Sequence, residues 1–164
     1  MGEEKKIFYR NCGEILRLAL DIESTLDFFI SNYFCSPQSY KTFLFKDLIL
    51  MEQTGLGFKR KIEIFKKICE REKIGRERVK KIIDAIQFVR EKRNMVSHGE
   101  AFVSDIKDGI KLQKGKSVKN KKDEIKITDE LVKEVEEKRL FSTREIVKIH
   151  IELSDPSGEK NIEW

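Results

Sequence analysis

The sequence predicts a mainly all-α fold, a helical bundle with a small β-hairpin after the fourth helix and C-terminal helices. Only two prolines and nine glycines occur in 164 residues, which favours long helices over a β-sandwich. Apolar residues recur at three- and four-residue steps through most of residues 3–99, as they do on amphipathic helices. Beyond residue 99 the apolar residues alternate with polar ones, which is typical of a hairpin.

The length predicts one domain with a short tail. Its expected parts are a helical bundle at 3–99, a basic hairpin at 109–127 and C-terminal helices at 128–154, with the domain covering 1–155 and a frayed tail at 156–164. The net charge of +5 is consistent with a polyanionic partner. No uncharged run approaches membrane-spanning length, and the first residues do not resemble a signal peptide. We therefore expect a cytoplasmic protein that does not enter a membrane.

The first two helices are predicted from apolar periodicity. The first extends from Glu3 to Phe34, before Pro37. Its apolar stripe consists of Ile15, Leu18, Ala19, Ile22, Leu26, Phe29, Ile30 and Tyr33. The acidic residues expected mostly on the opposite face are Asp21, Glu23 and Asp27. The second helix is expected from about Ser39 to Gln53, and its helical spacing favours core or dimer contacts over base stacking for its aromatic residues.

The third and fourth helices follow a glycine-containing turn. The third is expected from about Phe58 to Glu70. Its basic residues are Lys59, Arg60, Lys61, Lys66 and Lys67. Such a run is usually a solvated face, and the alternative is a surface that follows a nucleic-acid backbone. The fourth helix extends from about Arg76 to His98, and Gly99 is expected to end it in the left-handed conformation.

Beyond Gly99, strand-like alternation at 110–112 and 125–127 predicts an antiparallel hairpin. The loop that joins its strands is the most basic stretch of the chain. Its candidate nucleic-acid-binding residues are Lys119, Lys121 and Lys122. If RNA binds, these lysines would attract phosphate without regard to sequence, and simple solvation is the alternative explanation.

Two C-terminal helices are predicted from their caps. Thr128 is expected to cap a short helix that ends near Lys138. Ser142 and Glu145 match a capping box, which predicts a final helix from Thr143 to Ser154. Residues 146–153 also alternate as a strand would, and the capping box decides for a helix. His150 in this segment is expected to be a surface histidine without a catalytic role.

Arg93, Asn94 and His98 are the candidate site, because these residue types suit one chemistry. RNA is cleaved when its 2′-hydroxyl attacks the adjacent phosphorus, a step that needs a general acid or base titrating near neutral pH. A guanidinium group is a permanent cation that fits the oxygens of the phosphorane. This reaction needs no metal, and we expect no cofactor. The histidines lie far apart in sequence and no two cysteines have Cys-x-x-Cys spacing, so no metal site is expected.

The spacing of these residues raises a geometric question. Five residues correspond to about 140° around an ideal helix, so Arg93 and His98 diverge within one regular helix. Either the helix loosens at its end, or both side chains meet partners from another chain.

Arg93-Asn94, a three-residue spacer and His98 resemble the signature of the HEPN superfamily, although this motif covers only six residues. The resemblance implies a helical bundle that forms a homodimer and sets two motifs face to face. In active members the paired motifs form a metal-independent endoribonuclease site. There His98 would be the acid or base, Arg93 would contact the scissile phosphate and Asn94 would position base or phosphate. Many similar proteins are toxins or defence components, which implies an antitoxin or nucleotidyltransferase-like partner protein.

We therefore expect a dimeric endoribonuclease that acts on RNA. One alternative is a non-catalytic HEPN-like helical module that works through a partner protein, and large exposed Phe and Ile side chains on the first two helices would favour it. Another is an RNA-binding or nucleotide-binding module without turnover.

Overall fold

A computed structural model describes residues 2–35, 40–51, 56–103, 110–114 and 124–154, and it confirms the mainly α-helical fold. In chain order the elements are α1 (Glu3–Phe34), α2 (Tyr40–Phe45), the π-helical segment η1 (Lys46–Met51), α3 (Phe58–Arg71), α4 (Arg76–His98), β1 (Gly99–Val103), β2 (Ile110–Lys114), β3 (Glu124–Lys126) and α5 (Asp129–Ser154). The bounds of α1, α3 and α4 lie within one residue of their predicted ends. Over these ranges, no helix combines the length and apolar character needed to cross a membrane.

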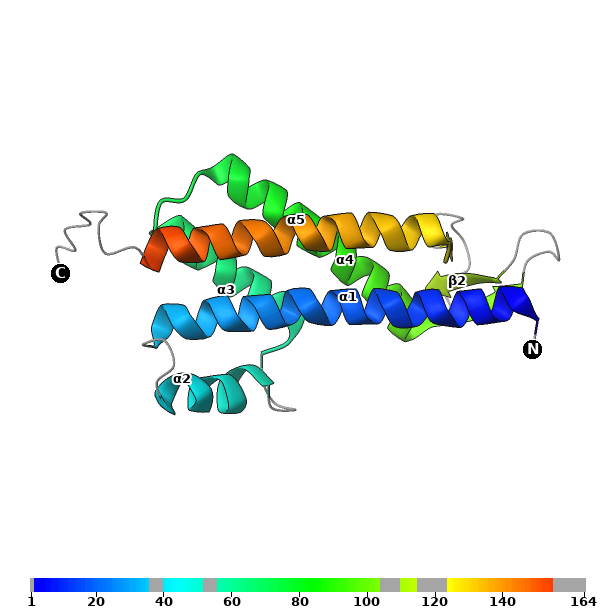
Figure 1. Ribbon diagram of the computed structural model, residues 1–164, viewed down its shortest axis with the longest axis horizontal. Helices are drawn as coiled ribbons and strands as arrows, with labels where there is room; N and C mark the ends of the chain where they lie inside the picture. Colours follow the sequence, from blue (N-terminus) through cyan, green and yellow to red (C-terminus); the bar gives the residue numbers. More distant parts are fainter. Residues whose placement is uncertain (1, 36–39, 52–55, 104–109, 115–123, 155–164) are drawn as a thin grey trace.

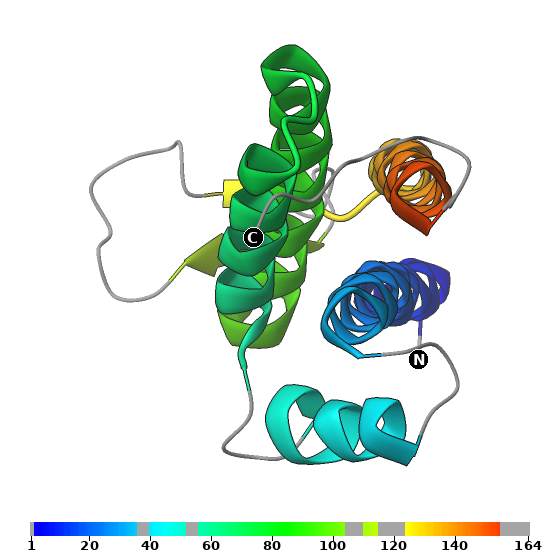
Figure 2. The ribbon, with the colours of Figure 1, turned by 90° about the vertical axis from the view of Figure 1, so that its left-hand side faces the viewer.

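The long helices α1 and α5 lie side by side and run in the same direction (Figure 1). Near their starts, Asn11 donates a hydrogen bond of 2.8 Å to Asp129. Near their ends, the rings of Phe28 and His150 lie 5.0 Å apart. Helices α3 and α4 form the opposite side of the bundle, and α2 lies next to α1 (Figure 2). The bundle therefore has one side built from α3 and α4 and another built from α1 and α5.

The core is formed by the apolar stripes of α1, α3, α4 and α5. Its largest fully buried side chains are Phe29, Phe65, Ile15, Leu18, Ile22, Leu26, Ile30, Ile82, Ile86, Ile146, Ile149 and Val89. Phe29 of α1 and Phe65 of α3 meet edge to face, with ring centroids 5.1 Å apart. Such pairs add to the stabilisation that burial of apolar area already provides.

A buried ion cluster joins α1 to α3, where the sequence predicted solvated faces. Lys61 is only 3% exposed and Asp27 only 4%. The Nζ atom of Lys61 donates to Glu23 Oε1 at 2.9 Å and to Asp27 Oδ2 at 3.0 Å. The prediction was wrong for Lys61 and Asp27 because α3 packs this side against α1, and buried charges persist when they are paired. Burial raises the pKa of Asp27, the bond from Lys61 opposes this, and the nearby charge of Glu23 reinforces it.

The C-terminal ends of α3 and α4 both depart from the usual pattern, in which a glycine adopts the left-handed conformation just after a helix. Helix α3 ends with Lys73 in the left-handed region at φ 57°, and Ile74 N–H bonds Cys69 C=O at 2.9 Å. Gly99, predicted to be left-handed, is extended at φ −76° and ψ 145° and begins β1. That prediction was wrong because the chain passes directly from helix to strand. A Cβ atom at Gly99 would lie 2.3 Å from the carbonyl oxygen of Met95, so close approach requires glycine there.

The predicted hairpin is confirmed, and β1 extends it to a sheet of order β1-β2-β3. In the antiparallel β2–β3 ladder Leu112 is opposite Ile125, and in the β1–β2 ladder Gly99 is opposite Lys114. Buried Leu112 and Ile127 belong to the same core as the helices. The loop lysines Lys119, Lys121 and Lys122 lie outside the described residues, as does the tail at 156–164.

Two predicted C-terminal helices are one continuous helix, α5. Thr128 does cap it, since Leu131 N–H bonds the Thr128 hydroxyl at 3.2 Å. Ser142 lies buried in its middle and donates instead to Lys138 C=O at 2.8 Å. Glu145 accepts a bond of 2.9 Å from Arg78 of α4. The capping-box prediction was wrong because both of its polar side chains bond elsewhere, which leaves the helix unbroken.

The second helix, predicted from about Ser39 to Gln53, is replaced by two shorter segments of different helical type. Helix α2 gives way at Lys46 to the π-helical η1, so the region is not one regular helix. Three successive apolar residues, Phe43, Leu44 and Phe45, cannot all face one stripe of a regular helix. Phe43 remains 60% exposed, whereas Leu50 of η1 is buried.

Candidate nucleic-acid interface

Helix α4 carries the predicted motif and remains α-helical as far as His98. Arg93 and Asn94 are half-buried, and His98 is exposed in the last turn. Because the helix does not loosen before His98, Arg93 and His98 stay about 140° apart around its axis. One of the two geometric alternatives, an irregular helix end, is therefore removed.

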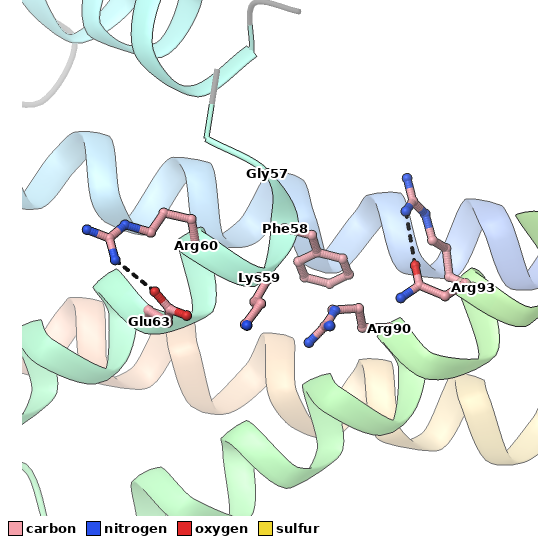
Figure 3. A pocket seen from close by; sticks show the side chains of 8 residues that line it. Gly57, Phe58, Lys59, Arg60, Glu63, Arg90 and Arg93 are labelled. Carbon is pink, nitrogen blue, oxygen red and sulfur yellow. Dashed lines mark hydrogen bonds and ion pairs between the residues drawn. The ribbon is translucent and has the colours of Figure 1, made fainter. Parts of the chain in front are cut away.

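A pocket of about 420 Å³ lies between the start of α3 and the second half of α4. Its lining residues are Gly57, Phe58, Lys59, Arg60, Glu63, Arg90, Arg93 and Asn94 (Figure 3). The structure thus brings Arg93 and Asn94 together, and the Arg93 Nη1 atom donates to Asn94 Oδ1 at 3.2 Å. His98 is not among the residues that line this pocket.

The pocket is strongly cationic, with four basic side chains against one carboxylate. The carboxylate, Glu63, accepts a bond of 2.8 Å from Arg60, and this bond lowers its pKa. Lys59 and Arg90 have no ion pair or hydrogen bond through their side chains with any described residue. The guanidinium group of Arg90 extends from α4 toward Lys59 of α3, whereas the guanidinium group of Arg93 extends away from them (Figure 3).

The N-terminal end of α3 adds to the positive electrostatic potential of the pocket. Gly57 is the N-cap residue, and no side chain caps the helix there. The first N–H groups of a helix and its macrodipole favour anions at this end. Together with the four cations, they make the pocket suited to a phosphate group.

The pocket also contains residues that the motif did not indicate. Lys59 and Arg60 belong to the basic run recognised in the sequence, but Arg90 was not singled out. Its spacing could have indicated that it belongs to the site, because Arg90 and Arg93 are three residues apart and such residues are neighbours on a helix surface. Lys61, counted in the same run, faces the buried ion cluster instead.

Other candidate groups lie elsewhere. Burial raises the pKa of the Cys69 thiol to about 12, which disfavours the thiolate that a nucleophile needs. His150 is half-buried, and burial lowers its pKa. In the described part of the chain, no group of three His, Cys, Asp or Glu residues could hold a metal ion.

Large exposed apolar side chains occur on the other elements. They are Tyr9, Leu20, Phe28 and Phe34 of α1, Tyr40, Phe43 and Leu44 of α2, Ile49 of η1, and Leu140, Phe141, Val147 and Ile151 of α5. Among described residues, none belongs to α3 or α4, the helices that form the pocket. Cationic and apolar surfaces are therefore carried by different helices.

Comparisons of the chain with protein-family models, with curated proteins and with solved structures found no match.

Proposed function

We propose that the protein is a metal-independent endoribonuclease whose site is completed by two copies of the chain. The observation that carries this proposal is the cation-lined pocket that holds Arg93 and Asn94, with His98 exposed at the end of the same helix. The pocket supplies phosphate contacts, and the exposed imidazole supplies a group for proton transfer.

In the proposed reaction the 2′-oxygen of a ribose attacks the adjacent phosphorus, and the bond from phosphorus to the 5′-oxygen breaks. One histidine accepts the proton of the 2′-hydroxyl, and a second donates a proton to the leaving 5′-oxygen. Arg93 stabilises the charge on the non-bridging oxygens, and Asn94 positions the phosphate or the base. The products are a 2′,3′-cyclic phosphate and a 5′-hydroxyl end.

The positions of the side chains support a homodimer as part of this proposal. Since Arg93 and His98 diverge around α4, one chain does not direct both at a single phosphate. Two chains that bring their α4 ends together would pair the Arg93 of each with the His98 of the other. They would also supply the two histidines that the reaction uses.

The test is incubation of purified protein with single-stranded RNA in excess EDTA. Cleavage should persist, and His98→Ala should lower its rate by about 100-fold or more, the usual contribution of general acid–base catalysis. RNA affinity should stay nearly unchanged, because the cations remain. His150→Ala is the matched control and should keep the wild-type rate. Full activity in His98→Ala, or a strict need for magnesium, would refute the mechanism.

A second candidate is a helical interaction module that acts through a partner protein. The exposed side chains of Phe28, Phe34, Phe43 and Ile49 favour it, because large apolar surfaces on α1, α2 and η1 suit protein contacts. The two candidates are compatible, since a toxin-like nuclease would need a neutralising partner. Co-expression with the product of the adjacent gene tests this candidate. Co-purification that Phe34→Ser and Phe43→Ser abolish, without loss of helicity, would support it.

A further inference from the structure

We propose that Lys59 and Arg90 form a second phosphate contact, which binds a phosphodiester of the RNA strand next to the one held by Arg93. This inference rests on the proposed function in that RNA is the ligand of both. It concerns binding alone and uses no step of the cleavage reaction.

The first argument is that two cations line one pocket and neither is directly bonded to a carboxylate of a described residue. Lys59 extends from the first turn of α3 and Arg90 from the second half of α4, and both line one pocket (Figure 3). Like charges that line one pocket repel one another, and a bound anion would offset this cost. Glu63, the only carboxylate among the described residues of the lining, is bonded to Arg60, and the more distant charge of Lys59 also lowers its pKa. A bound phosphate would therefore find Lys59 and Arg90 without a directly bonded carboxylate.

The second argument is the direction of Arg93. Its guanidinium group extends away from the Lys59–Arg90 pair, although all three side chains line the pocket (Figure 3). A site for one isolated phosphate would direct its cations at one point. Cations that point to two places fit a ligand with charges repeated along its length, such as the backbone of a single strand.

The experiment measures the salt dependence of RNA binding in the His98→Ala protein, in which cleavage is expected to be strongly slowed. The probe is a fluorescent single-stranded RNA octamer, titrated between 50 and 200 mM salt, values at which such dependence is large. In Lys59→Gln/Arg90→Gln the slope of log K against log salt should become shallower by about 0.7, the change for one lost single-strand phosphate contact. Lys59→Arg/Arg90→Lys preserves the charge and should restore the slope.

The matched control is Lys67→Gln/Arg76→Gln, which removes one lysine from α3 and one arginine from α4 outside the pocket. It should leave the slope close to that of the parent protein. A slope unchanged in Lys59→Gln/Arg90→Gln, or equally reduced in the control, would overturn the inference. So would a mononucleotide that binds as tightly as the octamer, because the pocket would then hold a free phosphate ligand.

These outcomes separate the inference from the proposed function. Wild-type protein that binds RNA through Lys59 and Arg90 but never cleaves it would support the inference and refute the nuclease. Cleavage with an unchanged slope would do the reverse. Absence of RNA binding by the wild type would refute both.

Discussion

Replacement of Lys61 by methionine should destabilise the protein more than the loss of an ordinary surface lysine. Methionine keeps much of the side-chain length but removes the ammonium group that lies 2.9 Å from Glu23 and 3.0 Å from Asp27. Asp27 is buried and would lose its charged partner, whereas Glu23 is partly exposed and can turn to water. Removing one partner of a buried pair typically costs about 3–5 kcal/mol. We expect a free energy of unfolding lower by about 3 kcal/mol, since Glu23 remains near water.

The double variant Asp27→Leu/Lys61→Met is the decisive comparison. When both buried charges are replaced by apolar side chains of similar size, the net effect is often neutral or stabilising. The double variant should therefore recover most of the stability that the single variant loses. Urea denaturation followed by circular dichroism gives both free energies. A cost below about 1 kcal/mol for Lys61→Met, or a double variant as unstable as the single one, would refute the buried cluster.

The same variants have a defined pH dependence. Because burial raises the pKa of Asp27, its contribution to stability is fully present below its ordinary value of 3.8. That contribution is lost as pH rises through the raised pKa. Without Lys61, the buried carboxyl group of Asp27 is more stable in its protonated form than in its charged form. The loss of unfolding free energy in Lys61→Met should therefore shrink as pH falls toward about 4, near the ordinary pKa of the carboxyl group. A deficit that grows on acidification would contradict this reasoning.

Three further predictions can be checked with the same material. Lys73→Gly should raise the unfolding free energy by about 0.5–1 kcal/mol, because glycine relieves the left-handed conformation, and a lower melting temperature would contradict this. Burial lowers the pKa of His150 below 6.5, so its contribution to stability is present above 6.5 and lost as pH falls through the lowered value. His150→Phe should remove that acid-side loss, which melting curves at several pH values would detect. Sedimentation should show a dimer at micromolar concentration, and a monomer alone would argue against a site shared by Arg93 and His98.

The main helices could be predicted because their apolar stripes already determine which side is buried. The stripe of α1, with residues such as Ile15, Ile22 and Leu26, becomes the centre of the core. The hairpin of β2 and β3 was equally clear from alternation at 110–112 and 125–127. In both cases local pattern and tertiary environment agree, so the periodicity was sufficient.

The unbroken course of α5 and the buried ion cluster could not be predicted, because they depend on contacts between residues far apart in the sequence. Ser142 and Glu145 fit a helix start, yet Glu145 bonds Arg78 across the bundle. Lys61 fits a solvated basic run, yet it faces Asp27, 34 residues away. No local pattern reveals such contacts, because tertiary packing overrides local propensity.

The same limit applies to the candidate site. The motif directed attention to Arg93, Asn94 and His98, but the pocket adds Lys59 and Arg90 from two helices. Their proximity depends on how α3 packs against α4, which spacing along the chain does not reveal.

The parallel pairing of α1 with α5 has a consequence for biosynthesis. Arg10 and Asp129, which bond at the start of this pair, are 119 residues apart. At a synthesis rate of about 5–20 residues per second, about 6–24 seconds pass between the synthesis of Arg10 and that of Asp129. Throughout that time the face of α1 that α5 later covers lacks this partner, and exposed apolar surface of this kind favours aggregation. A ribosome that stalls before residue 129 would leave this face open.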